Sequence, residues 1–129
     1  MHCPSCENKD GLAENIVTRG RTAVPGCVEG MVRVVRDPIE ADHLVAGEVL
    51  VTPMTDPESV PAMERAAAVV TERGGMLCHA AIVCREMGKP CVVGTANATT
   101  ALATGTRVRV CATRGVVVAL AAVPASSRA

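Results

Sequence analysis

The sequence contains no phenylalanine, tyrosine or tryptophan among its 129 residues. Without aromatic side chains there is no platform on which nucleic-acid bases could stack. The 13 Lys and Arg residues are balanced by 13 Asp and Glu residues, so there is no net positive charge to attract nucleic acid. We therefore exclude nucleic acid as a partner, and we expect a core built from Val, Ala, Leu, Ile and Met.

The sequence also lacks a long apolar run. The longest one extends from Val116 to Val123, which is far short of the roughly 20 residues that a membrane-spanning helix needs. The first residues do not form the apolar segment of a signal peptide. These two absences predict a cytoplasmic protein with no membrane partner.

Cysteine is present but not in a pattern typical of disulfides. The seven cysteines are an odd number, and Cys78, Cys84 and Cys91 lie in or next to apolar stretches, where reduced cysteine acts as a small hydrophobic residue. The sequence therefore predicts free thiols.

The size of the chain limits what it can do alone. A mass of 13.3 kDa corresponds to one domain, which we place at residues 23–119, with a polar extension at residues 1–22 and a tail at residues 120–129. The sequence has no Walker-type loop and no acidic cluster typical of a magnesium site. We expect no cofactor to be bound by this chain and no complete reaction to run on it.

One segment combines a glycine turn, a helix start and a histidine. Gly74 and Gly75 precede His79, and apolar residues follow at helical spacing, namely Ala80, Val83, Cys84 and Met87. This pattern predicts a helix whose apolar face packs inward and whose His79 lies at the rim of the domain.

The start of this helix is suited to binding an anion. No Ser, Thr, Asp or Asn stands at Met76, Leu77 or Cys78 to accept hydrogen bonds from the first helical amides. Such amides, together with the helix dipole, stabilise phosphate groups, and glycines allow the backbone to approach closely. A neutral imidazole is a competent nucleophile. His79 is therefore a candidate phosphoryl acceptor.

Strands and helices alternate along the rest of the domain. A buried strand at residues 68–71 delivers Thr71 and the glycine turn to the His79 helix, which places the chemistry at the carboxyl end of a strand. We predict further strands at 32–36, 48–52 and 91–93, helices at 60–66 and 98–102, the latter capped by Asn97, and a hairpin of strands at 107–111 and 116–118. These elements predict an α/β fold.

Several ordered motifs resemble the swivelling phosphohistidine domain of the phosphoenolpyruvate-utilising enzymes. Phosphoenolpyruvate synthase and pyruvate phosphate dikinase are the members with the most similar motifs, and the resemblance covers residues 23–118. It rests on Thr71-Glu72-Arg73-Gly74-Gly75, Cys78-His79-Ala80-Ala81-Ile82-Val83, Pro90-Cys91-Val92-Val93-Gly94-Thr95, Gly47-Glu48-Val49-Leu50-Val51 and Pro53-Met54-Thr55-Asp56-Pro57.

The resemblance implies a three-layer β/β/α fold and roles for particular residues. His79 would receive and donate the phosphoryl group, and Thr71 would lie beside the imidazole. Gly74, Gly75 and Cys78 are the candidate phosphoryl-binding residues. Arg85 matches the family too, but six residues after His79 it points away from the histidine, so we interpret it as a docking or structural residue.

Leu77 departs from the pattern of the dikinases and synthases, in which a threonine at this place is the target of a regulatory kinase. Leucine has no hydroxyl to modify, so we expect that regulation to be absent.

The resemblance also implies partners. The family enzymes use an ATP-grasp domain that binds nucleotide and a barrel that binds pyruvate or phosphoenolpyruvate. Neither is present here, so ATP, phosphoenolpyruvate and Mg²⁺ are expected on partner subunits. The alternative is a swivelling-type module that binds or regulates without carrying phosphate.

The extension contains Cys3 and Cys6, spaced as in half of a zinc site, with His2 as a third candidate ligand. His43, Cys27 or Cys111 could complete such a site only through a fold that the sequence does not reveal. An extension with two free thiols is the interpretation that we favour from the sequence.

Overall fold

The computed structural model describes residues 15–55 and 57–120. These residues form an α/β domain, as predicted, in which strands and short helices alternate. In chain order the elements are β1 (Asn15–Arg19), β2 (Arg21–Val24), β3 (Cys27–Val34), α1 (Pro38–Ala41), β4 (Val49–Thr52), a 3-10 turn (Pro57–Ser59), α2 (Val60–Arg65), β5 (Ala68–Thr71), α3 (His79–Met87), β6 (Cys91–Val93), α4 (Ala98–Ala101), β7 (Arg107–Cys111) and β8 (Val116–Ala119).

The strands form a mixed sheet in the order β1-β8-β7-β3-β4-β5-β6-β2. Strands β3, β4, β5 and β6 pair parallel with one another, whereas every pairing that involves β7, β8, β1 or β2 is antiparallel. Only Gly20 separates β1 from β2, although these strands lie at opposite ends of the order. The chain bends there against β6, where a Cβ on Gly20 would overlap the Val93 carbonyl.

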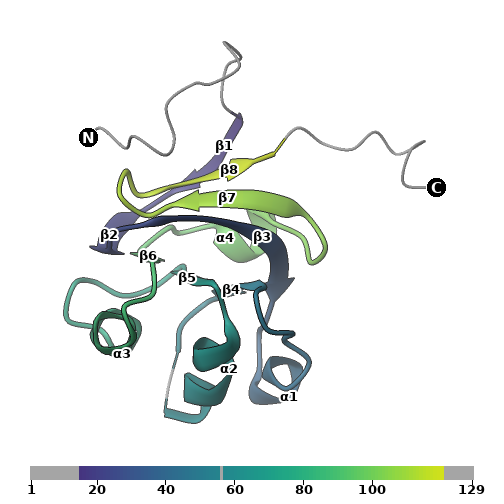
Figure 1. The fold of residues 1–129 in the computed structure, drawn as a ribbon, viewed down its shortest axis with the longest axis vertical. Coiled ribbons are helices and arrows are strands. Elements are labelled where there is room, and N and C mark those ends of the chain that lie inside the picture. Colours follow the sequence, from purple (N-terminus) through teal and green to yellow (C-terminus); the bar gives the residue numbers. More distant parts are fainter. Residues whose placement is uncertain (1–14, 56, 121–129) are drawn as a thin grey trace.

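The predicted three layers are present. Strands β1, β8, β7 and β3 form one half of the sheet, the remaining strands form the other half, and α1, α2 and α3 cover the far side of that second half (Figure 1). One apolar cluster lies between the two halves and includes Val32, Val110 and Val117. A second cluster lies under the helices and includes Leu50, Met63 and Cys84.

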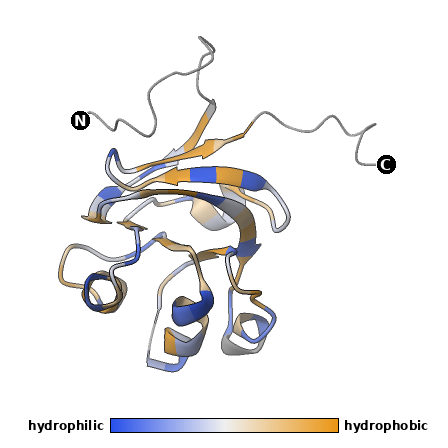
Figure 2. Ribbon diagram, in the orientation of Figure 1, coloured by the Kyte–Doolittle hydropathy of each residue, from blue (hydrophilic) through white to orange (hydrophobic). Residues whose placement is uncertain are grey.

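The core is aliphatic, as the lack of aromatic residues predicted. Its largest fully buried side chains are Leu50, Met63 and a set of valines, and hydrophobic residues follow the strands (Figure 2). No helix among the described residues is long and apolar enough to cross a membrane.

The structure changes three details of the sequence interpretation. Residues 15–22, which we assigned to the extension, belong to strands that pair with β8 and β6, whereas Cys3 and Cys6 lie outside the described residues. Strand β3 begins earlier than expected, at Cys27. Asn97 precedes α4 but makes no capping hydrogen bond; its Oδ1 accepts one from the Thr18 hydroxyl at 2.6 Å.

Candidate functional site

The site lies at the edge of the sheet where the parallel strands end. Strand β4 ends at Thr52 and β5 at Thr71, and the loops that follow these strands meet at the start of α3. This is the edge where open α/β sheets bind ligands, and it is where the sequence predicted the chemistry.

Thr71, at the end of β5, fixes the start of the glycine turn through its hydrogen bonds. Its side chain is fully buried and its hydroxyl donates to the Arg73 carbonyl at 2.8 Å. Its carbonyl accepts hydrogen bonds from the Thr95 hydroxyl at 3.0 Å and the Thr95 amide at 3.1 Å. Thr71 thus joins the ends of β5 and β6 and fixes the path of the turn.

The two glycines of the turn have different roles. Gly74 has φ +112°, and a Cβ there would meet the Cys78 sulfur at 2.7 Å, so this position requires glycine. Gly75 faces open space, and its carbonyl accepts the Cys78 amide at 3.1 Å. The close approach of the turn backbone to the Cys78 side chain therefore depends on Gly74.

Helix α3 begins at His79, as predicted, and Cys78 is its N-cap residue. The Cys78 side chain makes no capping hydrogen bond to the first amides of the helix. On the inner face Ala80, Ala81 and Cys84 are buried, with Val83 and Met87 packed beside them. The sequence pattern missed only Ala81.

The imidazole of His79 is held by a threonine other than the predicted one. The Thr55 Oγ1 lies 2.8 Å from His79 Nδ1, and Thr55 is 5% exposed. The place beside the ring that we assigned to Thr71 thus belongs to Thr55, because the Thr71 hydroxyl is directed to the Arg73 carbonyl. The signal was in the sequence, since Thr55 lies in one of the motifs that carry the family resemblance.

His79 opens onto a pocket of about 110 Å³ lined by Met54, Thr55, Arg73, Gly74, Cys78, His79 and Ala80. The ring is half-buried and the Arg73 side chain is exposed, so a cation stands at the rim beside the helix start. The combination of uncapped helical amides, a glycine backbone and a guanidinium suits an anionic group. Of the predicted residues, His79, Gly74 and Cys78 line this pocket, and Thr71 and Gly75 do not.

The residues around the mouth of the pocket are unusually apolar for a surface. Leu77 is 84% exposed and Met54 is 57% exposed, and Met76 and Ile82 are also exposed. Arg85 donates to the Met76 carbonyl at 2.6 Å, which ties the turn to α3. This contact supports the structural part of the interpretation of Arg85.

The cysteines near the site, Cys78, Cys84 and Cys91, form no disulfide. Cys84 and Cys91 are fully buried in the apolar cluster beneath α3. A hydrogen bond with Cys84, together with burial, raises the pKa of the Cys91 thiol, so it stays protonated. These two cysteines serve as small core residues, as predicted.

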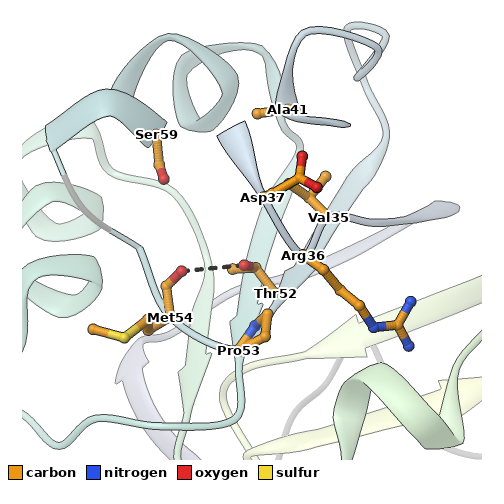
Figure 3. Close-up of a pocket in the computed structure, with 8 residues that line it drawn as sticks. All are labelled: Val35, Arg36, Asp37, Ala41, Thr52, Pro53, Met54 and Ser59. Atoms are coloured by element: carbon orange, nitrogen blue, oxygen red, sulfur yellow. Dashed lines mark hydrogen bonds between the residues drawn. The ribbon is translucent and has the colours of Figure 1, made fainter. Parts of the chain in front are cut away.

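A second pocket, of about 130 Å³, adjoins the first through Met54 and lies at the ends of β3 and β4 (Figure 3). Its polar groups are already used by the chain. The Asp37 carboxylate accepts the Glu40 amide, the Thr52 hydroxyl donates to the Met54 carbonyl at 3.1 Å, and Arg36 points away from Ser59 to donate to the Thr99 carbonyl. We assign it no chemistry.

Known proteins with similar sequences carry the same kind of domain. Residues 44–115 match the family model described as the mobile domain of PEP-utilising enzymes. The chain is 53% identical over 102 residues to phosphoenolpyruvate synthase from Pyrococcus furiosus, covering 79% of this chain and 12% of the relative. It is 45% identical over 111 residues to a probable phosphoenolpyruvate synthase from Methanothermobacter thermautotrophicus, covering 86% and 16%.

Solved structures show the same fold at low sequence identity. An aconitase X from Thermococcus kodakaraensis aligns with a TM-score of 0.62 and 24% identity, covering 81% of this chain and 98% of that chain. A solution structure of Enzyme I aligns with a TM-score of 0.55 and 24% identity, covering 68% and 36%.

The chain thus spans less than a fifth of the length of the synthases that it matches. The match to the family model covers more than half of the chain and includes the glycine turn, His79 and Thr55. This chain therefore belongs to the family of PEP-utilising enzyme mobile domains.

Proposed function

We propose that this chain is a phosphoryl carrier in which His79 is transiently phosphorylated on Nε2. The hydrogen bond between Thr55 and Nδ1 is the observation that carries the proposal. It holds the ring at the mouth of the pocket and uses Nδ1, so Nε2 is the nitrogen left to react. When Nδ1–H donates to the threonine oxygen, Nε2 bears the lone pair that a nucleophile needs.

The transfer step would proceed by direct displacement. With phosphoenolpyruvate as donor, the Nε2 lone pair attacks phosphorus, an N–P bond forms, and the bond from phosphorus to the enol oxygen breaks. The enolate leaves with the electron pair and takes up a proton to give pyruvate. In this step the first amides of α3 and the Arg73 guanidinium would stabilise the phosphoryl oxygens on the histidine.

The partners would supply the substrates. In this proposal an ATP-grasp-type subunit presents the nucleotide, a barrel subunit presents phosphoenolpyruvate or pyruvate, and Mg²⁺ is bound there. The identity of the relatives as phosphoenolpyruvate synthases supports this assignment, because this chain matches only a small part of their length. The exposed apolar residues around the pocket, Leu77 and Met54 among them, would contact these partners.

The proposal is tested by labelling the intact protein with ³²P-phosphoenolpyruvate in an extract of the cells that produce it. We expect an acid-labile, alkali-stable adduct in the wild type and none in His79→Ala. His43→Ala is the matched control, because His43 is an exposed histidine that follows α1, and it should label normally. Equal labelling of His79→Ala and wild type would contradict the carrier function. Absence of any adduct in the wild type would favour a binding or regulatory module.

A further inference from the structure

Two cysteines lie on the outer face of the half-sheet β1-β8-β7-β3. Val28, Val110 and Val117 of this half-sheet pack into the cluster between the two halves of the sheet. Successive side chains of a strand alternate between its faces. Cys27 and Cys111 therefore lie on the opposite face, where they belong to a separate small apolar cluster.

Strand register places these two cysteines directly opposite each other. Cys27 pairs with Cys111 between the antiparallel strands β3 and β7. The adjacent pair is hydrogen-bonded, because the Ala112 amide donates to the Gly26 carbonyl at 2.8 Å. Hydrogen-bonded and non-hydrogen-bonded pairs alternate along an antiparallel ladder, and at the second kind the Cα atoms are only about 4.5 Å apart. Disulfides span Cα separations of about 4.4–6.8 Å, so the two thiols can be joined without moving the strands.

The two thiols differ in their access to solvent. Cys27 is half-buried, whereas Cys111 is fully buried. The Cys111 sulfur accepts a hydrogen bond from Arg114 Nε at 3.2 Å, and a guanidinium beside a sulfur favours the thiolate, which is the reactive form. Cys27 can therefore meet a reagent from solvent, and Cys111 is placed to attack the product from inside the cluster.

The other described cysteines do not share this arrangement. Cys84 and Cys91 are hydrogen-bonded to each other, but both are fully buried, so a reagent from solvent reaches neither. Within residues 15–55 and 57–120, only Cys27 and Cys111 face each other across two paired strands. The pair thus combines disulfide geometry with one accessible thiol.

We propose that Cys27 and Cys111 form a reversible disulfide by exchange with a small-molecule disulfide such as oxidised glutathione. The Cys27 thiolate attacks one glutathione sulfur, and the other glutathione leaves as a thiolate. The Cys111 thiolate then attacks the Cys27 sulfur, and the second glutathione leaves in the same way. The two protons that the cysteines lose pass to the departing thiolates. Two protein thiols are thereby oxidised, and one glutathione disulfide is reduced to two thiols.

The cross-link would form at the edge of the sheet opposite the His79 site. Cys27 is the first residue of β3, which runs parallel to β4, and the His79 site lies beyond the carboxyl ends of the parallel strands. The two cysteines are 84 positions apart, and a disulfide that closes a long loop stabilises a fold most. We therefore expect oxidation to stabilise the domain and to leave the phosphorylation of His79 unchanged. The inference does not depend on the proposed carrier function.

The test is to equilibrate the intact chain with oxidised glutathione, alkylate the remaining thiols and map the tryptic peptides without reduction. Peptides 22–33 and 110–114 each contain a single cysteine, so a linked pair of these two identifies the cross-link. We expect the linked pair in the wild type, its loss on addition of dithiothreitol, and its absence in Cys27→Ser. Cys78→Ser is the matched control, because Cys78 is half-buried like Cys27 but lies at the start of α3, and it should still form the linked pair.

Thermal unfolding gives a second measurement. The oxidised wild type should melt roughly 10 °C above the reduced protein, whereas glutathione should not shift the melting temperature of Cys27→Ser. Far-UV circular dichroism of reduced Cys27→Ser should match that of the reduced wild type, and ³²P labelling of His79 should be equal in the oxidised and reduced wild type. The peptide map of the wild type decides the question even if a variant does not fold. Cys27 recovered only as a thiol, or only as its glutathione adduct, would overturn the proposal.

Discussion

Helices α3 and α4 begin at the same edge of the sheet, but they differ in whether a side chain accepts hydrogen bonds from their first amides. The start of α4 is closed by the chain itself, since the Glu72 carboxylate accepts the Thr99 amide at 2.8 Å and also the Thr99 hydroxyl. The start of α3 has no side-chain cap and opens onto the pocket that His79 lines. A carboxylate thus occupies the start of α4, and in the proposed function a phosphoryl group would occupy the corresponding place at α3.

A start of α3 without a cap from Cys78 is what the proposed carrier function requires. A side-chain cap typically stabilises a helix by about 1 kcal/mol, and α3 lacks one although the neighbouring α4 has one. An anion bound beside His79 would replace the missing cap. The comparison can be tested by adding a side-chain cap at the start of α3 or by removing the Glu72 cap from the start of α4.

Adding a side-chain cap at the start of α3 should have the largest effect on phosphorylation. In Cys78→Asp the new carboxylate would accept the first amides of α3, which should stabilise the fold by about 1 kcal/mol. It would also repel the incoming phosphoryl group, so labelling of His79 should fall by more than tenfold. Denaturant unfolding and the labelling assay measure the two effects. Cys78→Ala is the control and should label like the wild type; if both variants label normally, the open amides have no part in the reaction.

Removing the hydrogen bond between Thr55 and the His79 imidazole should have a smaller effect on the rate of labelling. Thr55→Val keeps the shape of the side chain but removes the hydrogen bond to Nδ1. Because such a bond contributes about 0.5–1.5 kcal/mol, the rate of labelling should fall by up to about tenfold. Thr55→Ser retains the hydroxyl and should restore most of the rate. A rate in Thr55→Val equal to that of the wild type would show that the contact does not orient the ring.

Removing the Glu72 cap from the start of α4 should lower the stability of the fold and leave the phosphorylation of His79 unchanged. Glu72→Ala removes the acceptor of the Thr99 amide, and an amide left without a partner costs about 1–3 kcal/mol. We expect that loss in denaturant unfolding, with His79 labelling unchanged below the unfolding transition. A large fall in labelling would mean that α4 and the Glu72 contact belong to the reactive site.

Much of this site could be predicted from the sequence because it is local in the chain. The glycine turn, the start of α3 and the missing cap all lie between Thr71 and Met87, and their spacing alone predicts them. The fold class followed from alternating strand and helix patterns. Both rest on interactions between residues that are close in the sequence.

The contacts that the sequence did not reveal join distant segments. Thr55 and His79 are 24 positions apart. Thr55 lies in the loop after β4, whereas Thr71 ends the neighbouring strand β5, so only packing decides which of the two threonines reaches the ring. The same holds for Glu72, which replaces Asn97 as the cap of α4. It also holds for β1, whose place beside β8 depends on a bend at Gly20.

Locating the phosphorus atom on the phosphorylated protein would show whether His79 carries the phosphoryl group. Heteronuclear NMR of the protein labelled with ¹⁵N-histidine distinguishes a ring substituted on Nδ1 from one substituted on Nε2. We expect phosphorus on Nε2 of His79, with Nδ1 still hydrogen-bonded to Thr55. Phosphorus on Nδ1 of His79, or on another histidine, would contradict it.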